Sequence, residues 1–285
     1  MRYGRSDAMD NPTLQKVAVV TGANKGIGLE ICRQLSARGV TVVLTSRDEE
    51  RGLAAVRKLE ASGAADVVFH QLDVNKSASI ASLGDFIHTR FGKLDILMQP
   101  VSSSGLANAI VETYELAEDC INTNYYGPKR VTEAFIPLLQ SSQSPRIVNV
   151  SSLYGKLQYI RSERIKEELR NVDTLSEDRL DQLVQAFMND FKEGKLDQNV
   201  WPTRNMVAYK VAKVALSAYT RILAKRYPKF CINCVNPGFV KTDLNWNLGV
   251  LPVEEGAEGP VLLAILPDGS PSGLFYDLKE VSSFE

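Results

Sequence analysis

Short apolar runs alternate with helical stretches along this 285-residue chain, and that alternation restricts the fold more than any other feature. Strands that are apolar at nearly every position are covered on both faces, as in parallel sheets. The segments between most of these runs have the length and periodicity of crossover helices. We therefore expect an α/β fold over residues 16–285, a single-domain, doubly wound parallel sheet of the Rossmann type with about seven strands. The expected strands are 16–21, 40–45, 67–73, 94–98, 146–151, 230–236 and 273–276.

Two segments lie outside this alternation. Residues 1–15 are expected to be a disordered lead into the first strand, and residues 156–205, which are rich in charge and contain no strand, are interpreted as a helical insertion. Within the insertion, Thr174 and Glu177 have the spacing of a capping box. The apolar residues that follow at helical spacing are Leu180, Leu183, Val184, Phe187, Met188 and Phe191. The insertion either lies near the mouth of a substrate pocket or is a solvated helix that packs on the body of the protein.

The composition excludes several classes of partner. A net charge of −1 gives no basis for attracting nucleic acid or an anionic membrane. No apolar run reaches the roughly 20 residues that cross a bilayer, and the N-terminus lacks the apolar core of a secretory signal, so a cytoplasmic protein is expected.

Cys231 and Cys234 form a C-x-x-C, but in a strand these positions point to opposite faces, so neither a metal nor a redox site is expected.

A glycine-rich turn joins the first strand to the helix that follows it. Residues 21–28 read T-G-A-N-K-G-I-G. Glycine permits positive φ and a close approach of the backbone to a pyrophosphate, and the start of a helix offers free N–H groups to the anion. A strand before the motif and a helix after it are the context that a dinucleotide site requires. The residues expected to bind the nucleotide here are Gly22, Asn24, Lys25, Gly26, Ile27 and Gly28.

The end of the second strand indicates which dinucleotide is bound. Sites that prefer NAD place an acidic residue about 20 positions after the glycines, where it holds the ribose 2′-hydroxyl. Here the strand ends at Ser46 and Arg47. Arg47 and Lys25 are both able to pair with a 2′-phosphate, so NADPH is the expected cofactor.

A tyrosine and a lysine stand four residues apart in a strongly helical stretch. Positions i and i+4 share one face of a helix, so Tyr209 and Lys213 project together. A free tyrosine has a pKa near 10, and a neighbouring ammonium stabilises the phenolate and lowers that pKa. The spacing therefore predicts an acid–base pair.

Further motifs accompany this pair. Ser151 follows the fifth strand at the edge of the sheet where ligands bind in such folds, and Asn124 falls in the preceding helix. Residues 236–243, after the sixth strand, read N-P-G-F-V-K-T-D. In order and spacing, from about residue 16 to residue 245, the set resembles the short-chain dehydrogenase/reductase family.

The resemblance implies a role for each residue. Tyr209 would give a proton to a carbonyl oxygen as hydride reaches the carbon, and Ser151, preferred to Ser152, would hydrogen-bond that oxygen. Lys213 would hold the nicotinamide ribose and lower the pKa of Tyr209, and Asn124 would seat a water that connects Lys213 to solvent. Further cofactor contacts are implied for Asp73, Val74, Pro237, Gly238, Val240 and Thr242.

The amino-acid sequences of several segments resemble those of a plant subgroup of this family, the menthone, neomenthol and salutaridine reductases. The stretches T-G-A-N-K-G-I-G-L-E-I-C-R-Q-L and T-N-Y-Y-G-P-K-R are typical of it, as are the long insertion and Trp201-Pro202 before the tyrosine. The likeness implies a monomer that reduces the ketone or aldehyde of a small hydrophobic, terpenoid- or alkaloid-like substrate. One group within it reduces a conjugated double bond and has replaced the tyrosine, so Tyr209 favours carbonyl reduction.

One segment departs from the family. After the fourth strand the family has N-N-A-G, whereas this chain reads Met98-Gln99-Pro100-Val101-Ser102. Proline cannot donate a ladder hydrogen bond and restricts the residue before it to extended geometry. Val101 is large enough to crowd the path of the cofactor. Two alternatives therefore stay open, an NADPH-binding protein with impaired catalysis and a reductase of a conjugated enone.

Overall fold

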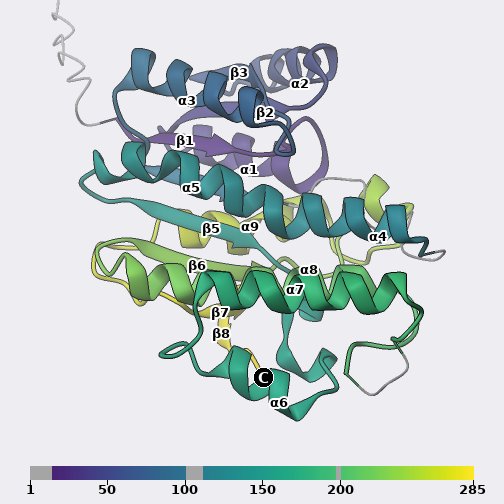
Figure 1. Ribbon diagram of the computed structural model, residues 1–285. Helices are drawn as coiled ribbons and strands as arrows, with labels where there is room; N and C mark the ends of the chain where they lie inside the picture. The colour runs from purple at the N-terminus through teal and green to yellow at the C-terminus, as the bar shows by residue number, and fades with distance from the viewer. Residues whose placement is uncertain (1–14, 101–111, 197–199) are drawn as a thin grey trace, which may run out of the picture.

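The computed structural model describes residues 15–100, 112–196 and 200–285. Within these ranges eight strands form one sheet in the order β3-β2-β1-β4-β5-β6-β7-β8 (Figure 1). The strands are β1 (Val17–Val20), β2 (Thr41–Ser46), β3 (Val67–Gln71), β4 (Ile96–Gln99), β5 (Arg146–Val150), β6 (Cys231–Asn236), β7 (Phe275–Asp277) and β8 (Glu280–Ser282). Strands β1 to β7 pair in parallel and β8 is antiparallel to β7. The expected doubly wound sheet is confirmed, with one additional edge strand.

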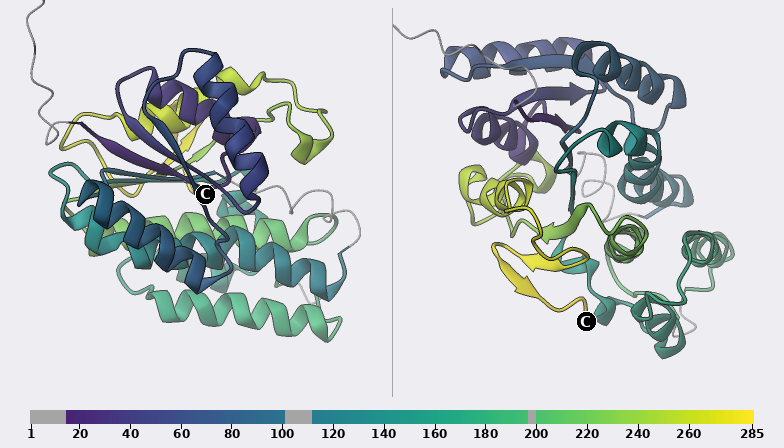
Figure 2. Two further views of the ribbon diagram at one scale, coloured as in Figure 1. Left: turned by 90° about the horizontal axis from the view of Figure 1, so that it is seen from above. Right: turned by 90° about the vertical axis from the view of Figure 1, so that its left-hand side faces the viewer.

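Helices cover both faces of the sheet, as Figure 2 shows. One face carries α1 (Gly26–Ser36), α2 (Glu49–Ala61) and α9 (Val253–Ala264). The other carries α3 (Ser77–Phe91), α4 (Tyr114–Ile121), α5 (Gly127–Gln140) and α8 (Val207–Arg226), with α6 (Glu163–Arg170) and α7 (Glu177–Lys192) beyond them. None of the helices in the described ranges combines the length and apolar character that crossing a membrane requires.

The strands are apolar throughout because each face of the sheet meets a separate core. Along β4, Ile96 and Met98 pack with α1 and α9, whereas Leu97 packs toward α5 and α8. Strand order reverses at β1, which lies between β2 and β4. In open sheets of this type, ligands bind beyond the carboxyl ends of the strands at such a reversal.

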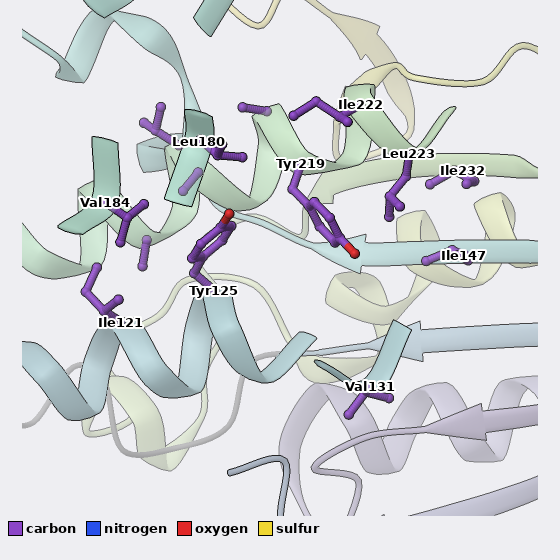
Figure 3. Packing of buried hydrophobic residues seen from close by; sticks show 14 of the residues in the cluster. Ile121, Tyr125, Val131, Ile147, Leu180, Val184, Tyr219, Ile222, Leu223 and Ile232 are labelled. Atoms are coloured by element: carbon purple, nitrogen blue, oxygen red, sulfur yellow. The ribbon is translucent and has the colours of Figure 1, made fainter. Parts of the chain in front are cut away.

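The segment 156–205 packs on the body of the protein through α7, which contacts α4 and α8. Leu180 and Val184 are buried in the same cluster as Ile121, Tyr125 and Tyr219 (Figure 3). Phe191, at the end of the predicted apolar stripe, is only partly buried.

The predicted capping box at Thr174 is wrong. Helix α7 begins at Glu177, and its N-cap is Ser176, whose hydroxyl accepts a hydrogen bond from the backbone N–H of Arg179 at 3.1 Å. The Thr174 hydroxyl instead donates to the carbonyl oxygen of Asn171. Two residues separate the predicted and observed starts because neighbouring Thr and Ser are both capable caps.

Candidate active site

A cleft of about 690 Å³ opens at the carboxyl edge of the sheet, lined by the segments that follow β1 to β6. Two of the four residues predicted to be catalytic, Ser151 and Tyr209, line this cleft. The other two, Asn124 and Lys213, are buried and do not line it. All of the predicted nucleotide-binding residues line it, namely Gly22, Asn24, Lys25, Gly26, Ile27, Gly28, Arg47, Asp73, Val74, Pro237, Gly238, Val240 and Thr242.

The glycine turn has a geometry that favours glycine. Gly22 and Gly26 have φ values of 57° and 58°. A Cβ atom on Gly28 would lie 2.8 Å from the carbonyl oxygen of Gly22, so the helix start and the turn are in direct backbone contact. Helix α1 begins at Gly26 without an acidic residue in its first turn, and Lys25 at its N-cap supplies no side-chain cap. The backbone N–H groups at this end are thus suited to bind a phosphate.

The two cations predicted for a 2′-phosphate lie in different surroundings. Lys25 is bonded to Asp243 at 2.9 Å, so it is not the free cation that the sequence suggested. Arg47 is exposed after β2 and makes no ion pair within the described ranges. Asp48 also lines the cleft, but its carboxylate caps α2 by accepting from the N–H of Arg51 at 2.9 Å.

The segments after β3 and β6 complete the cleft. The Asp73 carboxylate accepts from the N–H of Asn75 at 3.0 Å, and the side chain of Val74 lies where a Cβ on Gly127 would approach to 2.7 Å. Thr242 forms a reciprocal capping box with Asn245, which fixes the loop beside the glycine turn. These contacts hold the two segments in place by local bonds.

Tyr209 and Lys213 lie on one face of α8, as their spacing predicted. Both side chains are buried, and the Lys213 Nζ lies 5.6 Å from the centre of the Tyr209 ring. Lys213 donates a hydrogen bond of 2.9 Å to the carbonyl oxygen of Val150 at the end of β5. The ammonium is thereby fixed between the helix and the sheet.

Burial sets the protonation of this pair. It raises the pKa of Tyr209, while a hydrogen bond with Ser152 lowers it. It lowers the pKa of Lys213 to about 7. The expected lowering of the Tyr209 pKa by Lys213 is not found, because the cost of burying a phenolate exceeds the other contributions. Tyr209 is therefore a protonated donor at neutral pH.

The side chain of Ser152 lowers the pKa of Tyr209, whereas the sequence analysis preferred Ser151 as the serine that bonds the substrate oxygen. Ser151 pairs with Ser217 on α8 at 2.9 Å, and its side chain is buried. The strand's alternation explains the difference. Asn149 points toward α8, and Ser151, two residues on, points the same way and is taken up by that helix. This alternation was visible in the sequence.

Asn124 lies in a π-helical turn, Asn122–Tyr126, between α4 and α5. Its Nδ2 donates to the carbonyl oxygen of Cys120 at 2.9 Å, and its Oδ1 is buried without a partner in the part of the chain that the structure describes. Turns of this kind are frequent at functional sites. The free acceptor fits a residue that holds a water molecule.

The predicted departure after β4 lies partly outside the described residues, since Val101 and Ser102 are not among them. Gln99 is the last residue of β4 and pairs with Asn149 of β5, so the strand is continuous up to Pro100. Within the described ranges, no group of His, Cys, Asp and Glu residues is arranged to hold a metal ion. Cys231 and Cys234 are free thiols.

A doubly wound sheet with a glycine turn and a tyrosine–lysine pair at one cleft defines a nucleotide-dependent oxidoreductase. The chain matches the sequence profile of the short chain dehydrogenase family over residues 16–164. The protein belongs to this family, whose members bind a nicotinamide cofactor.

Relatives cover nearly the whole chain. Short-chain dehydrogenase/reductase 1 of Saponaria officinalis is 53% identical over 296 residues, which is 95% of this chain and 97% of that protein. The structure of salutaridine reductase from Papaver somniferum has a TM-score of 0.87 and 47% identity, covering 92% of this chain and 99% of its own. The structure of menthone neomenthol reductase from Mentha piperita has a TM-score of 0.83 and 43% identity, covering 94% and 100%.

The buried ammonium of Lys213 makes a prediction about stability. Its pKa is about 7 in the folded protein against the ordinary lysine value of 10.5, so between these values the unfolded chain binds one more proton. Stability must then rise with pH in this window, and the penalty is fully present below pH 7. The free energy of unfolding of the wild type, measured relative to that of Lys213→Met, is expected to rise by about 2–3 kcal/mol between pH 7 and pH 9.

Urea unfolding at both pH values measures this difference. Lys225→Met removes an exposed lysine of the same helix and serves as the control, whose difference from wild type should be the same at pH 7 and pH 9. Parallel pH profiles for wild type and Lys213→Met would contradict the assignment.

Proposed function

We propose that the protein is an NADPH-dependent reductase of the ketone or aldehyde group of a small hydrophobic substrate. The observation that carries the proposal is that Tyr209 and Ser152 line the same cleft as the glycine turn. A proton donor and a phosphate-binding turn at one cleft are the two parts that such a reaction needs. A monomer is proposed as the working form, as the resemblance to the plant subgroup implies.

The residues after each strand fit NADPH. The N–H groups of the glycine turn would hold the pyrophosphate, and Arg47, exposed and without an ion pair in the described ranges, would hold the 2′-phosphate. Asp73 would accept from the adenine amino group, while Thr242 and the backbone near Val240 would bind the carboxamide. When bound, the nicotinamide supplies the hydride.

The residues of the chain would then supply the proton and hold the substrate oxygen and the nicotinamide ribose in position. Tyr209 donates its proton to the carbonyl oxygen, and Ser152 holds that oxygen by a hydrogen bond. Lys213, one turn from Tyr209 behind the lining of the cleft, would hold the nicotinamide ribose and would connect through a water on Asn124 to the supply of protons. Because burial keeps the phenol protonated, Tyr209 is ready as an acid in the reductive direction.

The mouth of the cleft favours a hydrophobic substrate. Phe239, Trp246 and Leu248 line it and are 53%, 52% and 68% exposed. Large apolar side chains gathered at a cleft mark a surface that an apolar ligand covers. The names of the salutaridine and menthone neomenthol reductases agree with a terpenoid- or alkaloid-like ketone. Reduction of a conjugated double bond is the alternative, and analysis of the product distinguishes the two.

Substitutions at the tyrosine and the two serines test the chemistry. Tyr209→Phe should lower kcat by about 10²–10⁴-fold, because it removes the acid, while NADPH still binds. Ser152→Ala should lower kcat by about 10-fold or more, since it removes a hydrogen bond to the reacting oxygen. Ser151→Ala should mainly lower the melting temperature, because it leaves Ser217 without its partner.

Steady-state kinetics with a panel of hydrophobic ketones and fluorescence titration with NADPH provide the readouts. Full turnover by Tyr209→Phe would refute the mechanism. A larger loss of kcat for Ser151→Ala than for Ser152→Ala would return the role to Ser151. Binding of NADPH by the wild type without turnover of any ketone or aldehyde would identify a protein with impaired catalysis.

Arg47 should decide the choice of nucleotide. Arg47→Ala is expected to raise the Kd for NADPH by about 10–100-fold, the value of one or two charge-assisted hydrogen bonds, and to leave the Kd for NADH unchanged. Lys25→Ala is the matched comparison and should have a smaller effect, because Lys25 is already bonded to Asp243. Equal losses for both nucleotides would show that Arg47 does not contact the 2′-phosphate.

Trp246 should determine affinity for the substrate. Trp246→Ala is expected to raise KM for a bulky hydrophobic ketone by about 10-fold, because an aromatic contact surface is lost, with little change in the Kd for NADPH. Val250→Ala changes an exposed apolar residue of the same region that does not line the cleft, and it should leave KM unaltered. An equal effect of both substitutions would place the substrate elsewhere.

A further inference from the structure

A line of polar contacts joins helix α8 to strand β5. Lys213 bonds to the carbonyl oxygen of Val150 at 2.9 Å, and Ser217 pairs with Ser151 at 2.9 Å. Thr220 of α8 and Asn149 of β5 extend the line, since the Thr220 hydroxyl oxygen accepts a hydrogen bond from the Nδ2 of Asn149 at 2.9 Å. Lys213, Ser217 and Thr220 share one face of α8 with Tyr209. We call this line of contacts the α8–β5 seam.

Gln99 extends the seam to a third strand and a second helix. Its Nε2 donates to the Oδ1 of Asn149 at 2.9 Å and to the hydroxyl oxygen of Thr132 at 2.9 Å. Gln99 is 2% exposed, and its three network partners Asn149, Thr132 and Thr220 are fully buried. One amide group therefore connects α5 to α8 through β4 and β5.

The direction of each hydrogen bond in this chain is fixed. The Thr220 hydroxyl donates to the carbonyl oxygen of Leu216 at 2.8 Å, so it has to accept from Asn149. Asn149 then presents its Oδ1, which requires a donor. Gln99 supplies that donor through Nε2, while its own Oε1 has no partner among the described residues. The donor, and not the oxygen, is what the network needs from residue 99.

We infer that Gln99 is a positioning residue for the reaction, an inference that rests on the function proposed above. Thr132 lies on α5, which follows directly from the π-helical turn with Asn124, and Thr220 lies on α8 with Tyr209 and Lys213. The Gln99 amide thus holds at a fixed separation the two helices that bring the acid–base residues to the cleft. It does so at the position where the chain lacks the family's N-N-A-G.

Isosteric substitutions test this role. At a pH where the new carboxyl is ionised, Gln99→Glu keeps the shape and the oxygen but removes the donor, so an oxygen faces the Oδ1 of Asn149. We expect kcat to fall by about 10-fold or more, because misplacing an acid by a fraction of an ångström costs turnover. Gln99 itself lines the cleft, so the Kd for NADPH is compared in Thr132→Val and Thr220→Val, where it should change less than about 3-fold. Thr132→Val and Thr220→Val break the same chain with little change in volume and should act in the same direction.

Asn233→Asp is the matched control. Asn233 is a buried amide on the opposite face of the sheet, whose Nδ2 donates to the carbonyl oxygen of Pro271 at 3.0 Å. The control should lose stability without losing kcat. In the double variant Gln99→Glu/Thr220→Val, kcat should fall no further than in the worse single variant, since one chain is broken only once.

Two results would overturn the inference. The first is that Gln99→Glu retains its kcat while its melting temperature falls as in Asn233→Asp. The second is that the losses of kcat in the two single variants add up in the double variant. Should Gln99→Glu fail to fold, the two valine variants decide by the same criteria. A wild type that binds no NADPH and reduces no ketone would instead refute the proposed function, so the two failures are distinguishable.

Discussion

The buried ammonium of Lys213 against the carbonyl oxygen of Val150 is the contact on which the site depends. An ammonium without solvent is costly, and a single carbonyl offsets only part of that cost, which is why burial lowers its pKa to about 7. The contact fixes one turn of α8 against the last residue of β5. Since Tyr209 lies one turn earlier on the same helix face, its place at the cleft follows from this bond.

The parts of the fold that depend on local pattern were predictable from the sequence. Near-continuous apolar runs such as 40–45 and 146–151 correspond to buried parallel strands, since both faces of the sheet are covered. Strand β8 was not predicted, because three mostly exposed residues at the edge of a sheet carry no apolar signal. The start of α7 was misplaced because several residues before it have capping side chains, and only the folded backbone selects Ser176.

The features of the candidate site are likewise of two kinds, those that a local sequence pattern predicts and those that only the folded structure shows. The glycine turn and the spacing of Tyr209 and Lys213 are local patterns, and the structure brings both to the cleft or beside it. The pairing of Lys25 with Asp243 joins residues 218 positions apart, so no local pattern contains it. The burial that raises the pKa of Tyr209 is likewise a property of packing and is absent from the Y-x-x-x-K spacing.

The ion pair between Lys25 and Asp243 joins the glycine turn to the loop after β6, and both side chains are substantially exposed at 42% and 65%. Exposed pairs are weak and are screened over about 8–10 Å at physiological salt. Two segments that line the cleft are therefore joined by a bond whose strength varies with ionic strength. Buffer salt becomes a variable that acts on these exposed segments and leaves the buried side chains of Tyr209 and Lys213 unaffected.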